Sequence, residues 1–556
     1  MITYLVAEDH SEAFIMKIPI VIGVTGHRDL RQQDIPILRR MVRAELEKLK
    51  NGYPHSELVM LNSLASGADS LCAEEALPLG FRLVCPLPLP VEEYRKDFDE
   101  AEIRVFERLL SSAESVFVAP DLEPERPDRD FRYRQAGLFV ASHCHGLLSL
   151  WDGSVAKPDG CGTAEIVAFK LDGCRTAATP LNADAGAVLQ IVTPRMKNAV
   201  NPEISVQLWE KEPGQFHDIL TETDAYNRNA AAFTPENAPE PLLPEECLVN
   251  TRLKRLSELY AEADGLSLFF QKRYLYTMRG FAITGVLLIL FFLLYDTGES
   301  NLFLFGYGSL LLIYFLSFLF VKKQDAHGKY LNYRLLAETA RIQTYLTSVN
   351  AEANVGCLLT WTQKQESAWI RAAMDVLTAD AVGCNTVDEN IVRHCWIDSQ
   401  LAYHEKAGKR DGKRKHISEK TAQSMLTASI LLTFVLLLFE LFGGSLMETP
   451  LISSDAPSFL LQHTGQDFTL RSFFKLLLGI ISSVTVFLAD YYGRLSLDRK
   501  TEDHEKMARL YREAAEQFEN HPSERTELLI SLAQEEIIEN GNWVSYCREN
   551  PPSFDV

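Results

Sequence analysis

The chain has 556 residues, a length that predicts more than one folded domain at roughly 150 residues per domain. Its 55 Lys and Arg against 75 Asp and Glu give a net charge of −20, which argues against nucleic-acid binding because the phosphate backbone is itself anionic. Ten cysteines without a CxxC pair or a zinc-type spacing indicate a reduced, cytosolic setting and no metal site. The first 20 residues lack the basic and continuous apolar segments of a signal peptide, so we expect the N-terminal part not to be exported.

Strand-like apolar runs alternate with helix-like patterns over residues 18–193. The run 18–24 is followed by a segment that places Ile35, Leu38, Val42 and Leu46 on one helical face. The predicted strands cover residues 18–24, 58–61, 82–86, 115–119, 146–151 and 187–193. Apolar strands that alternate with helices predict an α/β, Rossmann-like domain with a mostly parallel sheet covered on both faces.

Small residues occupy several loops at the carboxyl ends of the predicted strands, where sheets of this class bind ligands. These residues are Gly23, Thr25, Gly26, Ser66, Gly67, Gly160, Gly162 and Thr163. Free N–H groups and a helix dipole at such turns suit an anion, and His27 and Arg28 add side-chain donors. A single glycine turn is equally typical of a tight turn without a ligand, and His27 or Arg28 alone is equally typical of a helix cap. Together, the loops predict a site for a phosphate-bearing ligand.

Residues 201–250 are rich in Pro, Glu, Asn and Ala, a composition typical of a linker. Asp224, Tyr226, Asn227 and Arg228 either fold back onto the N-terminal domain or form a solvated turn. A helical pattern then leads from Arg252 into the next part of the chain.

Four apolar segments predict an all-α membrane domain with spans at about 280–295, 302–321, 422–439 and 472–489. The segment 302–321 has twenty residues without a formal charge, and as a helix it extends over about 30 Å, enough to cross the hydrocarbon core. Buried core helices of a soluble protein are the alternative. One-sided charge favours membrane insertion, because the loop 296–301 contains no Lys or Arg and the loop 440–471 contains only Arg471.

Basic residues flank the other ends of all four segments. They are Lys272, Arg273, Arg279, Lys322, Lys323, Lys409, Arg410, Lys413, Arg414, Lys415, Lys420, Arg494, Arg499 and Lys500. The positive-inside rule therefore predicts a multi-pass protein with both termini in the cytoplasm. The spans also suggest one module used twice, over residues 251–350 and 351–556, since His327-x-Lys329 and His504-x-Lys506 follow the second and fourth spans.

Residues 15–200 resemble the SLOG family, sensor relatives of the LOG and DprA nucleotide-binding Rossmann folds. The resemblance rests on five motifs, which are Val24-Thr25-Gly26-His27-Arg28, Ser66-Gly67-Ala68-Asp69, Cys85-Pro86-Leu87-Pro88 with Tyr94, Leu150-Trp151-Asp152-Gly153 and Gly160-Cys161-Gly162-Thr163-Ala164-Glu165. It implies that Asp69, Tyr94 and Asp152 join the ligand-binding residues. The membrane half resembles the SLATT family, in which a two-span hairpin is flanked by cytoplasmic helices. In the second module the resemblance rests on residues ahead of the spans, which are Trp396, Asp398, Gln400 and Tyr403.

The two resemblances imply a membrane effector of bacterial antiviral (antiphage) signalling in the bacterial inner membrane. The SLOG-like domain would bind a nucleotide-derived second messenger, either a cyclic oligonucleotide or an ADP-ribose derivative, made by a partner cyclase or an NAD-consuming enzyme. Binding would gate an oligomeric transmembrane pore that disrupts the membrane, since four helices from one chain leave little room for a water-filled path. We expect a homo-oligomer with the lipid bilayer as a partner, and no cofactor apart from the ligand.

An enzyme is the alternative. LOG-like hydrolases carry a GxGTxxE loop whose acid acts on the glycosidic bond of a nucleotide, and here the position three after Thr163 is Ile166. Glu165 is one place early, which turns a helical side chain by about 100°. We therefore expect no catalytic residue and a sensor rather than a hydrolase. An unusual geometry that recruits Asp69, Asp152 or Glu165 would make the chain a membrane-tethered nucleotide-processing enzyme, and a passive scaffold is the third hypothesis.

Overall fold

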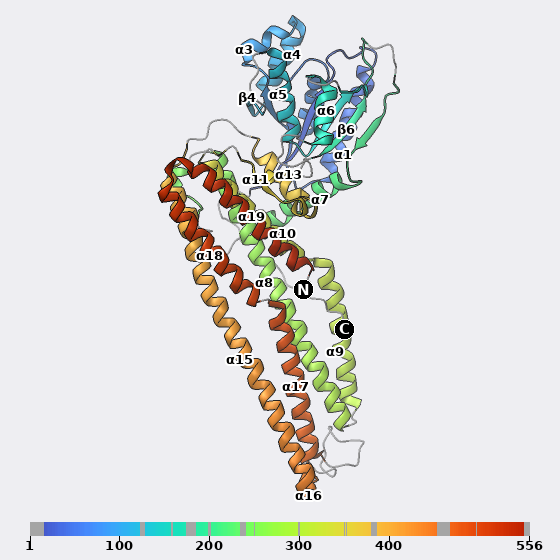
Figure 1. Cartoon of the computed structure of the whole chain (residues 1–556). Helices are drawn as coiled ribbons and strands as arrows, with labels where there is room; N and C mark the ends of the chain where they lie inside the picture. The colour runs from blue at the N-terminus through green and yellow to red at the C-terminus, as the bar shows by residue number, and fades with distance from the viewer. Residues whose placement is uncertain are drawn as a thin grey trace, which may run out of the picture. The chain divides into compact units, whose positions relative to one another are not determined.

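The computed structural model forms two compact units, each described by itself below (Figure 1). The first comprises Met1–Leu266, Tyr333–Val392 and Arg525–Trp543, and the second comprises Ser267–Asn332, Arg393–Glu524 and Val544–Val556. The structure describes residues 16–122, 128–156, 160–173, 185–197, 202–233, 241–248, 251–298, 301–349, 351, 353–379, 386–452, 468–495 and 497–549. Most of the N-terminal segment examined for a signal peptide lies outside these residues, as do residues 453–467 of the second predicted outer loop.

A seven-stranded sheet in the order β4-β3-β2-β1-β5-β6-β7 forms the core of the first unit. Its strands are β1 (Ile20–Gly26), β2 (Leu58–Leu61), β3 (Arg82–Leu87), β4 (Ser115–Val118), β5 (Gly146–Trp151), β6 (Ala187–Val192) and β7 (Val206–Trp209). All neighbours pair in parallel except β6 and β7, which are antiparallel. The predicted Rossmann-like domain with a mostly parallel sheet is therefore confirmed.

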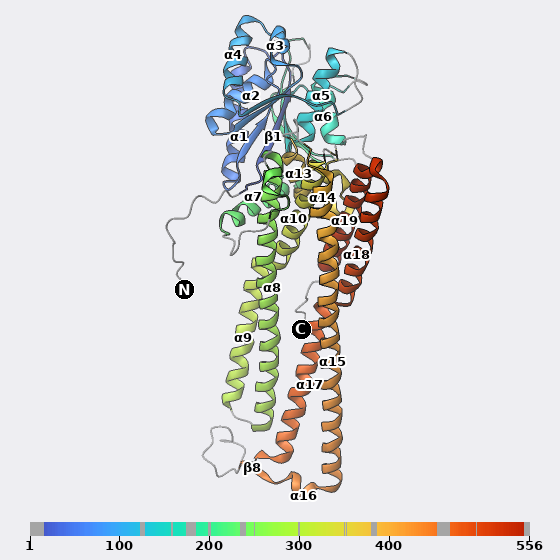
Figure 2. The same cartoon turned by 90° about the vertical axis from the view of Figure 1, so that its left-hand side faces the viewer.

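Helices cover both faces of this sheet, which explains why its central strands are apolar without alternation. The helices are α1 (Ile35–Gly52), α2 (Ala68–Ala76), α3 (Val91–Tyr94), α4 (Glu100–Ser111), α5 (Arg129–Ser142) and α6 (Thr163–Asp172). Figure 2 shows α1 and α2 on one side of the sheet and α5 and α6 on the other. The four buried residues of α1 are Leu38, Val42, Leu46 and Leu49, in agreement with the predicted apolar face.

The segment 201–250, predicted as a linker, is instead folded over much of its described length. Residues 206–209 form β7, and residues 215–231 form α7 (Gln215–Ala231). The buried face of α7 consists of Leu220, Thr223, Tyr226, Asn227 and Ala230. Composition concealed this helix because its buried residues are largely polar or small, so the average over the segment has the character of a loop. Residues 234–240, which carry most of the Pro-rich part, lie outside the described residues.

A group of helices completes the first unit. It contains α11 (Val355–Leu358), α12 (Trp361–Glu366), α13 (Ala368–Leu377) and parts of α8 (Thr251–Gly298), α10 (Ala326–Ser348), α14 (Glu389–Arg393) and α19 (Arg525–Glu549). Leu336, Ala340 and Tyr345 of α10 and Leu532, Ala533 and Ile537 of α19 are among their buried residues.

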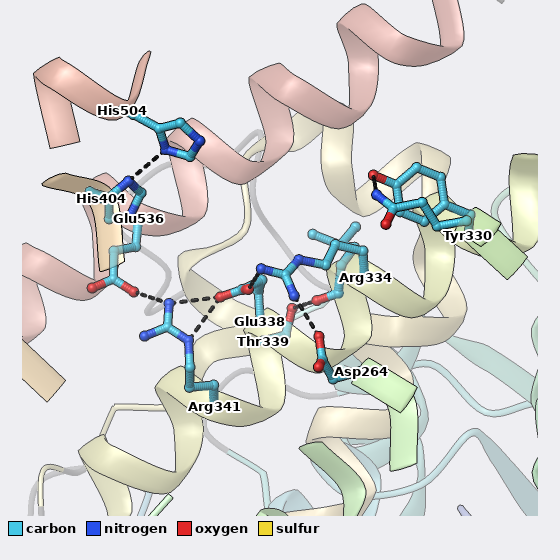
Figure 3. Close-up of polar contacts among 11 residues, drawn as sticks. Asp264, Tyr330, Arg334, Glu338, Thr339, Arg341, His404, His504 and Glu536 are labelled. Atoms are coloured by element: carbon cyan, nitrogen blue, oxygen red, sulfur yellow. Dashed lines mark hydrogen bonds and ion pairs between the residues drawn. The ribbon is translucent and has the colours of Figure 1, made fainter. Parts of the chain in front are cut away.

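The second unit is helical apart from a short hairpin, β8 (Pro450–Ile452) and β9 (Phe468–Thr469). Its helices are the rest of α8 and α10, α9 (Asn301–Gln324), α15 (Ser399–Phe442), α16 (Gly444–Met447), α17 (Leu470–Leu495) and α18 (Leu497–Asn520), and a π-helical turn at His394–Asp398 precedes α15. Nδ1 of His404 on α15 lies 3.0 Å from Nδ1 of His504 on α18 (Figure 3).

Within the described residues, four helices are long and apolar enough to cross a membrane: Thr251–Asp296, Asn301–Ser348, Glu389–Phe439 and Leu470–Leu488. The first three each contain one of the four predicted spans, and the fourth covers the last predicted span up to Leu488. Large apolar side chains on them are exposed, such as Phe305 at 75% and Phe320 at 62%, as expected for helices whose surrounding solvent is lipid. The all-α domain with four candidate transmembrane helices is thus confirmed, and it is compatible with a bilayer environment.

Glycines bring the candidate membrane helices close together. A Cβ atom at Gly285 of α8 would lie 2.5 Å from the Phe487 ring of α17, and one at Gly479 of α17 would lie 2.6 Å from Leu293 of α8. Near the ends of the two predicted pairs a tyrosine meets a histidine, with ring centroids 4.7 Å apart for Tyr274 and His327 and 6.0 Å apart for Tyr403 and His504. These contacts are similar, but the use of one module twice stays a prediction.

Candidate ligand-binding site

The order of the strands creates a topological switch point beside β1. The chain winds from β1 to β4 towards one edge of the sheet and then continues with β5 on the other side of β1. In open α/β sheets ligands bind at such a switch point, outside the carboxyl ends of the strands. The loops that follow β1 and β5 flank this point, and they carry His27, Arg28 and Asp152.

His27 and Asp152 join the two loops across the switch point. Nε2 of His27 lies 3.2 Å from Oδ1 of Asp152, and the backbone N–H of Asp152 donates a hydrogen bond of 3.1 Å to the same nitrogen. Nε2 is therefore an acceptor and carries no proton in this arrangement. Burial, together with the positive charge of Arg195, lowers the pKa of His27, so the imidazole is neutral at pH 7. Burial raises the pKa of Asp152, but hydrogen bonds from Ser154 outweigh it and keep this pKa below its usual value.

Arg28 provides an exposed cation beside aromatic side chains and a buried acid. Its guanidinium carbon lies 5.1 Å from the centre of the Tyr133 ring, and the Tyr133 ring lies 6.0 Å from that of Tyr94. Tyr94 is only 1% exposed, and burial raises the pKa of its hydroxyl, which stays protonated. Burial also raises the pKa of Asp69 to about 7, with Arg28 acting in the opposite direction. This group combines one cation with a tyrosine hydroxyl and an acid that is partly neutral.

Glycines allow the loops after β1 and β2 to pack backbone against backbone. Gly67 has φ +83°, and a Cβ atom there would lie 2.5 Å from the carbonyl oxygen of Arg28. A Cβ atom on Gly26 would lie 2.3 Å from that of Ala68, whose N–H donates to the carbonyl oxygen of His27 at 3.0 Å. Both glycines are therefore required for close approach, and through this approach they fix the position of His27 and Arg28.

The loop before α6 is held by contacts of its own. The carboxylate of Glu165 folds back and accepts a hydrogen bond of 3.0 Å from the N–H of Gly162, and Nη1 of Arg134 donates to the carbonyl oxygen of Gly160 at 2.8 Å. Thr163 is the first residue of α6. Ile166 is 3% exposed and packs against Gly137 of α5, so the position expected to carry an acid in a LOG-like hydrolase faces the core.

The remaining predicted residues have simpler positions. Gly23 lies inside β1, where a Cβ atom would lie 2.8 Å from Val140 and Cys144, so it permits α5 to pack on the sheet and does not line the loop. Thr25 is in β1 opposite Ser149 of β5, and Ser66 is half-buried directly before Gly67.

Sequence reasoning missed three residues near the pair of His27 and Asp152. Nε of Arg195 donates to Oδ1 of Asp29 at 2.9 Å, and this arginine is the one whose charge lowers the pKa of His27. Tyr133 lies under Arg28. Arg195 lies two residues after the end of the predicted strand 187–193, so the strand-end rule applied to the other loops would also have identified it. The position of Tyr133 on α5 gave no comparable signal.

The arrangement suits a ligand bound through an anionic group and hydrogen bonds. Arg28 supplies charge, and neutral His27 and partly neutral Asp69 supply hydrogen-bonding groups of mixed character. Within the part of the chain that the structure describes, no three His, Cys, Asp or Glu side chains are grouped so that they could hold a metal ion.

Comparison with known proteins adds no family to this description. No family model matches the sequence, and no curated protein matches it.

Proposed function

We propose that the protein is a ligand-gated membrane effector. Its Rossmann-like domain binds a nucleotide-derived signal, a cyclic oligonucleotide or an ADP-ribose derivative, at the carboxyl edge of the sheet. Its apolar helices form an oligomeric pore in the bacterial inner membrane with both termini in the cytoplasm. The resemblance to SLOG and SLATT proteins supports a role in antiviral signalling, with the ligand supplied by a partner enzyme.

One observation carries the proposal. The contact between His27 and Asp152 closes the switch point between β1 and β5, beside an exposed arginine, on a chain that also has four helices able to cross a membrane. A ligand that binds one of two states of such a chain more tightly shifts the equilibrium of the membrane part by its differential affinity. A binding site and a membrane domain on one chain are the elements that this coupling requires.

The arrangement of charge supports the proposed orientation and assembly. Basic residues flank one side of the candidate spans, which favours a cytoplasmic location for that side. Four helices are few for a water-filled path, so we propose that several copies of the chain surround the pore.

Release of dye from liposomes tests the proposal. Purified protein in vesicles would receive cyclic dinucleotides, cyclic trinucleotides and ADP-ribose derivatives in turn, with binding measured separately by calorimetry. We expect one ligand to trigger release and expect a variant with His27→Ala and Arg28→Ala to lose both binding and release. A matched control carries Arg40→Ala and His521→Ala, two exposed residues outside the site.

Each other outcome has a definite meaning. Turnover of a nucleotide in the same vesicles would favour the alternative, a membrane-tethered nucleotide-processing enzyme. Absence of both binding and release with every ligand would favour a passive scaffold and overturn the proposal.

A further inference from the structure

Helix α7 contacts the amino ends of strands β1 and β2, whereas the candidate ligand site lies at their carboxyl ends. The side-chain amide of Asn227 accepts from the N–H of Ile18 at 2.9 Å and donates to the carbonyl oxygen of Ile18 at 2.9 Å. It also donates to Oγ of Ser56 at 2.9 Å. Asn227 is 0% exposed. Its amide therefore satisfies the buried backbone N–H and C=O groups of Ile18, just before β1, as a neighbouring strand would.

Asp224, one turn earlier on α7, contacts the segment before β2. Its Oδ1 accepts from the N–H of His55 at 2.8 Å and from Oγ of Ser56 at 2.9 Å. Together, Asp224 and Asn227 therefore bind the segments at the amino ends of β1 and β2. The far ends of these two strands carry the loops with His27, Arg28, Gly67 and Asp69.

The opposite side of α7 packs on other helices of the same unit. The Tyr226 ring is 0% exposed and lies edge-on to the Tyr333 ring of α10, with centroids 5.5 Å apart, and 6.1 Å from the Trp369 ring of α13. Nδ2 of Asn229 donates to the hydroxyl of Tyr333 at 2.6 Å. One short helix therefore connects two strands of the sheet with α10.

Ion pairs extend the connection from α10 to two further helices of this unit (Figure 3). Arg334 contacts Asp264 of α8 at 2.5 Å, and Arg341 contacts Glu536 of α19 at 2.8 Å. The chain reaches α10 directly from α9, which contains the predicted span 302–321, and the later part of α8 contains the predicted span 280–295. Movement of α10 therefore acts on segments that are continuous with two of the candidate spans.

We infer that α7 transmits the state of the ligand site to the membrane helices, with Asn227 and Tyr226 as positioning residues on its two sides. This inference rests on the proposed ligand-gated function. The residues touch no ligand; they make α7 follow β1 and β2 because the amide of Asn227 pairs fully within the contact, with both of its bonds to Ile18 buried. Coupling through α7 requires that a change on its α10 side alters release without altering ligand binding, so the two are measured separately.

Tyr333→Phe is the decisive variant. It removes the hydroxyl that accepts from Asn229 and keeps the ring that packs on Tyr226. In the full-length protein in vesicles, we expect the affinity for the active member of the ligand panel to stay within about twofold. We expect dye release at saturating ligand to fall by at least about fivefold, the lower limit of typical coupling between two sites.

Two further variants complete the design. Asn227→Ala should also separate binding from release, but it leaves the backbone of Ile18 unpaired, so its thermal unfolding must be checked first. Arg228→Ala is the matched control because Arg228 is exposed on the same helix, and it should bind and release as the wild type does. Hydrogen exchange gives an independent readout: ligand should change the protection of α10 in the wild type and in Arg228→Ala but not in Tyr333→Phe.

The outcomes distinguish failure of the proposed transmission through α7, here called the relay, from failure of the proposed ligand-gated function. Normal binding with normal release in Tyr333→Phe and Asn227→Ala would overturn the relay and leave the proposed function intact. Loss of binding in Tyr333→Phe would also overturn it, because the contact would then support the ligand site itself. A wild-type protein whose release no ligand changes would overturn both.

Discussion

The backbone N–H of Asp152 donates a hydrogen bond of 3.1 Å to Nε2 of His27, a residue 125 positions earlier in the chain. The bond joins the loops after β1 and β5 and requires an unprotonated Nε2. Protonation of His27 must therefore break this backbone bond, and Nε2–H would then face Oδ1 of Asp152, 3.2 Å away, so the protonation state of one side chain decides which bond joins the two loops.

The first prediction concerns the pH dependence of ligand binding. Burial and the charge of Arg195 hold the pKa of His27 below 6.5 in the free protein. A phosphodiester placed beside it would raise this pKa, so affinity should increase as the pH falls from 8 to 6, by up to about tenfold for each unit of the shift. Calorimetry at pH 8, 7 and 6 measures this, and His27→Gln should reduce the slope to the part contributed by Asp69, whose pKa is about 7. An unchanged slope in His27→Gln would assign the proton to another group; His521→Gln, at an exposed site, is the control.

The second prediction concerns Asp69 and stability. Its pKa is raised from 3.8 to about 7 by burial, so its contribution to the free energy of unfolding is fully present below pH 3.8 and is lost as the pH rises through about 7. Asp69→Asn keeps a neutral side chain at every pH. At pH 8 the variant should have a higher free energy of unfolding than the wild type, by up to about 4 kcal/mol, and the difference should shrink towards pH 4; thermal unfolding at each pH measures it. A constant difference across this range would contradict the raised pKa, and the exposed Asp130→Asn should show no trend.

The third prediction separates backbone strain from close packing. Gly67 and Gly80 both have positive φ, +83° and +89°, but a Cβ atom at Gly80 has nothing within 4 Å, whereas one at Gly67 meets the backbone of Arg28. Gly80→Ala should cost about 1 kcal/mol from strain alone. Gly67→Ala should cost clearly more and should abolish ligand binding, because the loop that carries His27 and Arg28 must move. Equal unfolding temperatures and equal binding for the two variants would show that the close approach is not needed.

Much of the sheet and its ligand edge could be predicted from the sequence, because central parallel strands are continuous apolar runs and their loops meet at one edge. The strands 58–61 and 146–151 have the predicted bounds. His27 and Asp152 come together as that rule implies. The rule fails for Gly23. This glycine lies near a strand end, but it allows α5 to pack on the sheet and does not line a ligand-binding loop.

The part that escaped prediction is the part whose pattern depends on tertiary partners. The helix α7 was not predicted, although Asn227 does fold back onto the N-terminal domain, one of the two alternatives that its sequence left open. Asn227 is polar, yet it is fully buried because it pairs with the backbone of Ile18, 209 positions away. No local periodicity identifies such a residue, so α7 was concealed within a segment of linker composition. Strand β7 was not predicted for a similar reason. Its four residues carry little local pattern, and they form a strand because they pair antiparallel with β6.

The fourth prediction tests the orientation in the membrane. Glu448 is exposed in the loop after α16, and Lys413 is exposed on α15 before its candidate span. With cytoplasmic termini, a membrane-impermeant maleimide should label Glu448→Cys in intact spheroplasts but should label Lys413→Cys only after permeabilisation. The exposed native Cys161 and Cys357 act as internal controls for an intact membrane. The reverse pattern would invert the proposed topology.

The fifth prediction concerns the buried ion pair between Arg341 and Glu536, which are 5% and 1% exposed at their side chains. Arg341 also pairs with Glu338 at 2.7 Å, so Arg341→Met removes the cation beside the buried Glu536 and one of the two beside Glu338, which still contacts Arg334 at 2.5 Å. We expect this to lower the free energy of unfolding by about 3–5 kcal/mol, measured by thermal unfolding in detergent. Glu535→Ala, an exposed neighbour on α19, should change it by less than about 0.5 kcal/mol. Adding Glu338→Gln and Glu536→Gln to Arg341→Met should restore most of the loss because no buried charge then remains unpaired; if stability does not recover, the arginine contributes by packing rather than by charge.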